Sequence, residues 1–272
     1  MPSQHIINNF RTNRLPHIWC PGCGHGVLMK SITTAIEELG LDKNKVVIVS
    51  GIGCSSRAGG YMDYSTLHTT HGRALAFATG VKLANPELHV LCIMGDGDSS
   101  AIGGNHLIHA CRRNIDITAI IFNNNIYGMT GGQYSPTTPT NDRGTTAPFG
   151  NIDRPFDICE LAVGAGATYV ARSTAYHAKA MSGYVKKGLQ HKGFAVIEGM
   201  SGCPTYYGRK NKKGSAPELF KFMKDTYVDK KAAEKMTEEQ LVGKQLMGEY
   251  VNKDNVPEYT EMYRQVIDAA QA

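Results

Sequence analysis

The sequence of 272 residues has neither a long apolar run nor a large excess of charge of one sign. No stretch of about 18 apolar residues occurs, which excludes a transmembrane helix, so we expect no membrane segment. The first ten residues, MPSQHIINNF, lack the apolar core of a secretory signal, so we expect a cytoplasmic protein. A net charge of +5 permits anionic ligands but does not require nucleic acid as a partner.

The sequence also lacks an even set of cysteines: it has seven, which argues against a framework of disulfide bonds. Three of them stand in apolar segments and are expected to be buried free thiols: Cys92, Cys111 and Cys159. The other four stand in loops rich in glycine or proline: Cys20, Cys23, Cys54 and Cys203. Four thiolates can hold zinc or an iron–sulfur cluster, although one C-x-x-C pair with two distant cysteines is a weak spacing signal by itself.

Short apolar runs of strand type alternate with segments of helical periodicity. The runs are VVIVS (46–50), HVLCIM (89–94), ITAIIF (117–122), TYVAR (168–172) and FAVIEGM (194–200). A helix is expected over residues 25–39, where apolar residues recur at helical spacing, and further helices are expected between the other strands. This alternation predicts an α/β fold with a mostly parallel sheet, helices on both faces, and ligands at the carboxyl ends of the strands.

The pattern divides the chain into two parts. Residues 1–205 are expected to form the α/β domain. The remainder, residues 206–272, begins with the basic segment RKNKK and is rich in Lys, Glu and Met. We expect it to form a C-terminal helical tail, with RKNKK as a solvated loop.

A candidate magnesium site follows two of the predicted strands. Asp96 stands between two glycines after the strand at 89–94, and Asn124 follows 28 residues later. One helix and one strand fill this interval, so both side chains should arrive at adjacent strand ends. Carboxylate and amide oxygens, a backbone carbonyl and diphosphate oxygens would suit magnesium, and the glycines would let a phosphate approach the backbone. Asn123 and Asn125 are alternatives to Asn124, disfavoured only by their spacing to Tyr127.

The combined pattern, Gly-Asp-Gly followed at this interval by Asn-Asn and a Tyr-Gly pair, resembles the thiamine diphosphate motif. The resemblance implies that Asp96, the side chain of Asn124 and the backbone carbonyl of Ile126 ligate magnesium. It also assigns His71 to the cofactor diphosphate, although a polar capping role is the alternative. Loop residues expected to contact the cofactor are Ile52, Gly53, Cys54, Ser55, Gly97, Asp98, Gly128 and Met129. His25 and His68 receive no role.

With the loop cysteines included, residues 15 to 205 resemble the thiamine-binding β subunit of the 2-oxoacid:ferredoxin oxidoreductases. The motifs that carry this resemblance are CPGCGHG, GIGCSSR, THGRALAFATGVKLANP, NNNIYGMTGGQYSPTTP and SGCP. The 2-oxoglutarate branch is the most similar, through GGNHLIHACRRN, GQYSPTTP and FGNIDRPFD. The resemblance implies that Cys20, Cys23, Cys54 and Cys203 hold a 4Fe-4S cluster. It is weaker to the multi-cluster, single-chain pyruvate enzymes, because the chain lacks ferredoxin-type cysteine runs.

The implied reaction interconverts 2-oxoglutarate plus coenzyme A with succinyl-coenzyme A plus CO2, with electrons passing to or from ferredoxin. The same residues would serve either direction. In the family, the glutamate that activates thiamine comes from a second domain on an α subunit, so we expect an active site at a subunit interface. Arg57, where the family has a basic residue, is expected to bind a carboxylate of the substrate through two parallel hydrogen bonds.

Three other functions compete with this one. A β subunit specific for pyruvate or for a broad range of 2-oxo acids would use the same motifs. A thiamine enzyme without a cluster would leave the four loop cysteines unexplained. A zinc-bearing nucleic-acid-binding module would need a basic stripe, whereas here the 29 basic residues are spread among 24 acidic ones.

Overall fold

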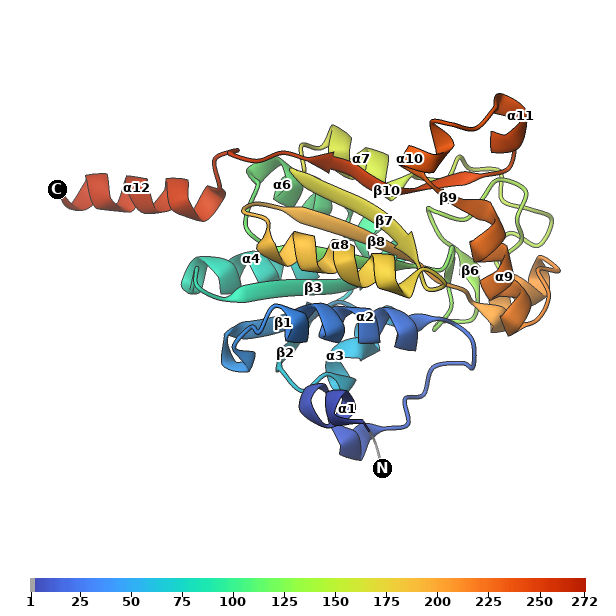
Figure 1. The fold of residues 1–272 in the computed structure, drawn as a ribbon, viewed down its shortest axis with the longest axis horizontal. Coiled ribbons are helices and arrows are strands. Elements are labelled where there is room, and N and C mark those ends of the chain that lie inside the picture. The colour runs from blue at the N-terminus through green and yellow to red at the C-terminus, as the bar shows by residue number, and fades with distance from the viewer. Residues whose placement is uncertain (1–2) are drawn as a thin grey trace.

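The computed structural model describes residues 3–272 and is built on one eight-stranded sheet (Figure 1). The strands lie in the order β2-β1-β3-β4-β8-β7-β10-β9. Their bounds are β1 (Val46–Ser50), β2 (Ser65–His68), β3 (His89–Gly95), β4 (Thr118–Asn123), β7 (Tyr169–Thr174), β8 (Ala195–Met200), β9 (Tyr227–Asp229) and β10 (Gln245–Asn252). Only the pairing of β10 with β7 is antiparallel, which confirms the mostly parallel sheet. A separate small hairpin joins β5 (Ile126–Tyr127) to β6 (Gln133–Tyr134).

Helices cover both faces of the sheet (Figure 1). One face packs against α2 (His25–Glu38) and α8 (Ala178–Gln190), and the other against α4 (Ala74–Ala84), α6 (Gly104–Arg113) and α7 (Ile158–Gly164). Because successive side chains alternate between the faces, both must be apolar, and this is why the central strands are continuous apolar runs. The other helices are α1 (Gln4–Asn9), α3 (Ala58–Tyr61), α5 (Asp96–Ser100), α9 (Ala216–Thr226), α10 (Lys230–Ala233) and α11 (Glu238–Leu241), and α12 (Tyr259–Gln271) ends the chain.

The predicted elements of the central domain are confirmed. The strands at 46–50, 89–94, 117–122 and 194–200 start and end within one residue of β1, β3, β4 and β8. The helix at 25–39 corresponds to α2. The three thiols expected in the core, Cys92, Cys111 and Cys159, are buried.

The helical description of the C-terminal segment needs correction. Strand β10 pairs antiparallel with β7, and β9 pairs parallel with β10, so residues after 205 extend the sheet. The sequence of β10, QLMGEYVN, has no continuous apolar run, which agrees with a strand in which only Gly248 is fully buried. Helix α12 does extend away from the body of the protein, as Figure 1 shows. Within residues 3–272, no helix combines the length and the apolar character that crossing a bilayer requires.

Candidate active site

The residues predicted to hold the thiamine cofactor converge on one groove at the carboxyl ends of β1, β3 and β4. The loop after each of these strands contributes side chains or backbone, as the parallel arrangement requires. The predicted residues that line the groove are Ile52, Gly53, Cys54, Ser55, His71, Asp96, Gly97, Asp98, Asn124, Ile126, Gly128 and Met129. The groove also includes residues that the sequence did not assign, namely His25, Gly95, Phe122, Tyr127 and Thr130.

Asp96 is the first residue of α5 and is buried. Its Oδ2 accepts hydrogen bonds from Ser135 Oγ at 2.5 Å and Thr137 Oγ1 at 2.8 Å. Burial raises the pKa of Asp96 to about 6, and the two hydroxyls oppose this effect. A cation beside the carboxylate would favour its charged form, so this residue fits a divalent ion with oxygen ligands.

The three consecutive asparagines, Asn123, Asn124 and Asn125, lie in different environments. Asn123 is used internally: its amide donates to Glu198 Oε1 at 2.8 Å, and its oxygen accepts the backbone N–H of Asn125 at 2.9 Å. Asn124 lines the groove together with Asp96, and its Oδ1 accepts the backbone N–H of Ile126 at 3.3 Å. The geometry therefore favours Asn124 over its neighbours as a partner of Asp96.

Asp98, on α5, joins the loops that follow β1 and β2. Its Oδ1 accepts hydrogen bonds from His71 Nδ1 at 2.5 Å, from the backbone N–H of Gly72 at 2.7 Å, and from that of Ile52 at 3.3 Å. Since the carboxylate occupies Nδ1, the Nε2 of His71 is the ring nitrogen that can meet a ligand. Asp98 thus positions His71 and the loop after β1. Gly51 is required here, because a Cβ at this position would lie 1.9 Å from Asp98 Oδ2.

Several buried polar atoms at the groove have no partner among the described residues. They are the Nδ1 of His25, the Oγ of Ser55 and the Oδ2 of Asp98. Buried polar groups in native structures are nearly always hydrogen-bonded, so a polar ligand would complete these three. The groove encloses only about 70 Å³, much less than the roughly 300–1,000 Å³ of typical ligand pockets, so a large ligand would need a second wall.

A second cavity of about 270 Å³ adjoins the groove and brings together the four loop cysteines, Cys20, Cys23, Cys54 and Cys203. A methyl group at Gly128 would lie 3.5 Å from the sulfur of Cys203 and 3.6 Å from that of Cys54, so both sulfurs face this glycine. Thr205 Oγ1 donates to the sulfur of Cys20 at 3.3 Å. Three loops that are far apart in the sequence thus present four thiols to one space.

The electrostatics of this cavity oppose thiolates unless a cation is present. Burial raises the pKa of Cys23 and of Cys54 to about 11, and the repulsion between neighbouring cysteines adds to this. Burial also raises the pKa of Cys203, opposed by the backbone N–H groups of Tyr207, Tyr206 and Thr205. A metal centre that binds the four thiolates would remove this cost.

The spacing of the four sulfurs can be compared with that of a zinc site. Within the described residues, no three of the four sulfurs lie within 4.8 Å of one another. Ligands of one tetrahedral zinc ion would be separated by about 3.8 Å, given Zn–S bonds of about 2.3 Å. This spacing does not match the ligand set of a single zinc ion.

Arg57 lies at the cysteine cavity, not in the groove. It ends a 3-10 turn, Ser55–Arg57, and its side chain is exposed. Its guanidinium acts on Cys54, whose pKa it lowers against the larger effect of burial. The structure therefore brings Arg57 to the mouth of the site, and its binding of a substrate carboxylate stays a prediction.

His25 is the main residue that the sequence analysis left without a role. Its ring lines both the groove and the cysteine cavity. Burial lowers the pKa of His25 to about 4, opposed by the main chain of Cys23, so the ring is neutral at pH 7. The available signal was its position directly after CPGCG. Ser135 and Thr137 were missed as well, because only the fold brings the loop SPTTP to Asp96.

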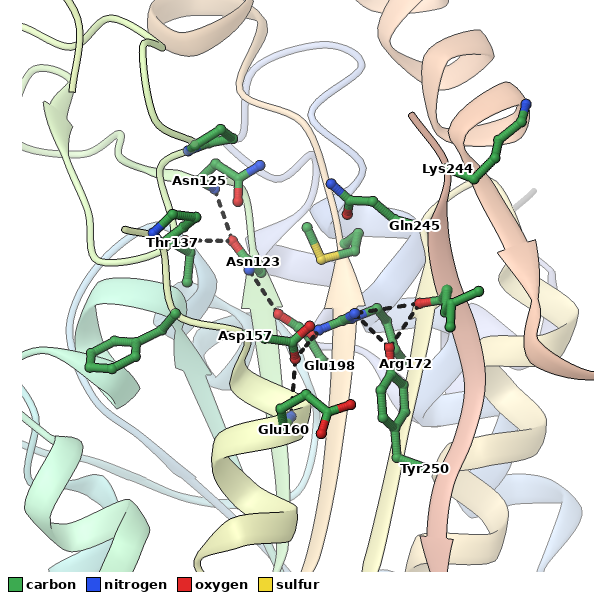
Figure 2. A pocket seen from close by; sticks show the side chains of 15 residues that line it. Asn123, Asn125, Thr137, Asp157, Glu160, Arg172, Glu198, Lys244, Gln245 and Tyr250 are labelled. Atoms are coloured by element: carbon green, nitrogen blue, oxygen red, sulfur yellow. Dashed lines mark hydrogen bonds and ion pairs between the residues drawn. The ribbon is translucent and has the colours of Figure 1, made fainter. Parts of the chain in front are cut away.

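A third cavity, of about 410 Å³, surrounds Arg172 beside the ends of β8 and β7 (Figure 2). Arg172 donates to Glu198 at 2.5 Å, to Asp157 at 2.6 Å and to the hydroxyl of Tyr250 at 2.6 Å. The carboxylate of Glu198 also accepts the amide of Asn123 (Figure 2). These partners satisfy one another, so the cluster supports the fold rather than presenting free groups to a ligand.

The comparisons with known proteins agree with this geometry. The family described as thiamine pyrophosphate enzyme, C-terminal TPP binding domain, matches residues 51–199. The 2-oxoglutarate synthase subunit KorB of Methanocaldococcus jannaschii is 52% identical over 262 residues, which cover 96% of this chain and 97% of that protein. The chain belongs to the KorB family. The predicted family and the thiamine diphosphate-binding fold are thereby confirmed, and the chain is one subunit of an oxidoreductase.

A further relative and a solved structure support the assignment of this chain to the KorB family. A 2-oxoacid:ferredoxin oxidoreductase subunit beta from Saccharolobus solfataricus is 44% identical over 213 residues, which cover 78% of this chain and 70% of that protein. Among solved structures, the 2-oxoglutarate:ferredoxin oxidoreductase from Magnetococcus marinus matches with a TM-score of 0.87 and 31% identity. The match covers 100% of this chain and 92% of that one. That structure is described with 2-oxoglutarate, coenzyme A and succinyl-CoA bound.

Proposed function

We propose that this chain is the thiamine- and cluster-bearing β subunit of a 2-oxoglutarate synthase. The enzyme interconverts 2-oxoglutarate plus coenzyme A with succinyl-coenzyme A plus CO2, with electrons to or from ferredoxin. The observation that carries the proposal is the shared wall between the groove and the cysteine cavity. Cys54, His25 and Asn124 line both spaces, so a group in the groove would lie directly beside a cluster.

In this proposal the groove binds thiamine diphosphate through magnesium. Asp96, the side chain of Asn124 and the backbone carbonyl of Ile126 are the magnesium ligands, with Ser135 and Thr137 fixing the carboxylate of Asp96. His71, held by Asp98, presents Nε2 to the diphosphate. The loop residues Ile52, Gly53, Ser55, Gly97, Gly128 and Met129 form the remaining wall.

The four cysteines Cys20, Cys23, Cys54 and Cys203 would hold a 4Fe-4S cluster, and Arg57 would bind a carboxylate of the substrate. When bound, thiamine diphosphate supplies the nucleophilic carbon for 2-oxo acid chemistry, and the cluster accepts electrons one at a time. This chain's residues bind the groups, orient them and separate them by one layer of side chains. No nucleophilic side chain is required for the reaction.

The partners follow from the shape of the groove. Its small closed volume supports a second wall from an α subunit that carries the other thiamine domain. Ferredoxin would exchange electrons with the cluster, and the assembled enzyme would work in the cytoplasm.

A broad 2-oxo acid specificity is the second candidate, because the Saccharolobus solfataricus relative is named a 2-oxoacid:ferredoxin oxidoreductase. The higher identity to the Methanocaldococcus jannaschii 2-oxoglutarate synthase subunit favours 2-oxoglutarate. The ratio of kcat/KM for 2-oxoglutarate to that for pyruvate would decide between them. A ratio near one would support the broad enzyme.

The cofactor content of the complex purified anaerobically with its partner subunit tests the proposal. We expect about four iron and four sulfide per chain, with thiamine diphosphate and magnesium. Cys203→Ser should lose iron, whereas Cys111→Ser, a change at a buried cysteine outside the cavity, should keep it. Zinc without iron, or iron insensitive to Cys203→Ser, would contradict the assignment.

A further inference from the structure

His25 occupies the partition between the groove and the cysteine cavity. It is the first residue of α2, and its side chain lines both spaces while only 1% of the residue is exposed. The ring is therefore one of the groups that contact both spaces, together with Cys54 and Asn124.

The ring is held in place by aromatic neighbours. It packs edge-on against Phe122, with ring centroids 5.3 Å apart, and tilted against Trp19 at 5.6 Å. Hydrogen bonds join both His25 and Trp19 to segments that contain a cavity cysteine. The backbone N–H of His25 donates to the sulfur of Cys23 at 3.5 Å, and the indole of Trp19 donates to the carbonyl of Cys54 at 2.7 Å.

The polar ring of His25 packs against the aromatic rings of Phe122 and Trp19. Its Nδ1 is buried without a partner among residues 3–272. A buried unpartnered nitrogen is unfavourable unless a group absent from the chain itself completes it.

We propose that the His25 imidazole donates a hydrogen bond to a sulfur of the cluster and so raises the cluster's reduction potential. The inference rests on the proposed function, because it requires the cluster in the cysteine cavity. Reduction adds negative charge to the cluster, and a donor aimed at its sulfurs stabilises that charge. The cluster is favoured over the thiamine cofactor as the acceptor because the backbone of His25 is hydrogen-bonded to the sulfur of Cys23, and the Trp19 ring that packs on His25 is hydrogen-bonded to Cys54.

The test is the midpoint potential of the cluster, measured by EPR-monitored redox titration of the complete enzyme complex. His25→Phe should shift the potential to a more negative value while iron and thiamine content stay at the wild-type level. His17→Phe is the matched control. This exposed histidine packs on the same Trp19 ring, with centroids 5.0 Å apart, but lines neither space, so its potential should equal that of the wild type.

Two amide variants identify which ring nitrogen of His25 donates the hydrogen bond. They also provide a test if His25→Phe loses iron. His25→Asn places an N–H near the position of Nδ1, and His25→Gln places one near that of Nε2. One of them should keep the wild-type potential, and the other should shift with His25→Phe. Equal potentials in the two amide variants, or an unchanged potential in iron-loaded His25→Phe, would overturn the inference. A shift in thiamine affinity alone would also overturn it and would assign the ring to the groove. A wild-type complex without iron would instead refute the proposed function.

Discussion

At the scale of single residues, the groove is organised by hydrogen bonds to the side chains that face it. Two hydroxyls from one loop, those of Ser135 and Thr137, orient the carboxylate of Asp96, and Asp98 orients His71. Each of these supporting residues acts through a neighbour that faces the groove. Groups that orient metal ligands in this way typically change metal affinity by about 10–100-fold when removed.

The first prediction concerns Thr137. Thr137→Val keeps the shape but removes the donor to Asp96, so the affinity for magnesium and thiamine diphosphate should fall by about 10–100-fold. Thr137→Ser should restore most of it. Isothermal titration of the cofactor-depleted complex measures the effect. Thr118→Val is the control, because this buried hydroxyl bonds to Gly188 away from the groove. Equal affinities in Thr137→Val and Thr118→Val would refute the role.

The second prediction concerns Arg57, whose guanidinium lies at the mouth of the cysteine cavity. Arg57→Met should reduce kcat/KM for 2-oxoglutarate by the equivalent of roughly 2–5 kcal/mol, because the substrate and the second wall from the partner subunit would desolvate this exposed guanidinium. Arg57→Lys should recover part of this, because it keeps the charge without the planar fork. Iron and thiamine content should stay near normal. A wild-type kcat/KM in Arg57→Met would exclude a role in substrate binding, and loss of the cluster would make the residue structural.

At the scale of secondary structure, the strands that the sequence predicts clearly are those that are buried on both faces. Strands β3, β4 and β8 are covered on both faces, so their continuous apolar runs predicted them. Strand β2, with the sequence STLH, lies at the sheet edge and is largely exposed, and β10 is only partly buried, so neither has a clear pattern. The approach of Ser135 and Thr137 to Asp96 depends on a loop whose path no local pattern encodes. The motif residues were predictable because parallel strands end at one edge, whereas the residues that support them were not.

The third prediction concerns the attachment of β10 to the sheet. Arg172 on β7 joins Glu198 on β8 to Tyr250 on β10, and only 1% of Glu198 is exposed. Arg172→Met would leave a buried unpaired charge, so the free energy of unfolding should fall by about 3–5 kcal/mol. Arg264→Met, at an exposed pair with Asp268, should cost less than about 1 kcal/mol. Urea unfolding of the two variants compares them, and similar losses would contradict a structural role for the cluster.

At the scale of the whole molecule, the chain carries two adjoining half-enclosed sites and three core thiols that belong to neither. Burial raises the pKa of Cys111 to about 12, so this thiol should be unreactive near neutral pH even when it is free. Cys20, in contrast, is exposed at the edge of the cysteine cavity. Reactivity toward an alkylating reagent can therefore distinguish cluster ligands from core thiols.

The fourth prediction is a pattern of alkylation measured by mass spectrometry on the native complex. With the cluster present, Cys20, Cys23, Cys54 and Cys203 should be protected. After removal of the cluster by chelation and oxidation, Cys20 should react first, while Cys92, Cys111 and Cys159 stay unmodified. Labelling of Cys20 at the same rate before and after cluster removal would argue against its role as a ligand.

This chain should join thiamine chemistry to electron transfer only within a complex. The most direct test is the anaerobic reduction of ferredoxin by 2-oxoglutarate and coenzyme A, followed by visible absorbance, with succinyl-coenzyme A measured as the product. The complex of this chain with its partner subunit should reduce ferredoxin in a reaction that requires thiamine diphosphate and coenzyme A, and the isolated chain should not. A complex that contains full iron and thiamine but fails to reduce ferredoxin with 2-oxoglutarate, or an isolated chain that succeeds, would contradict the account.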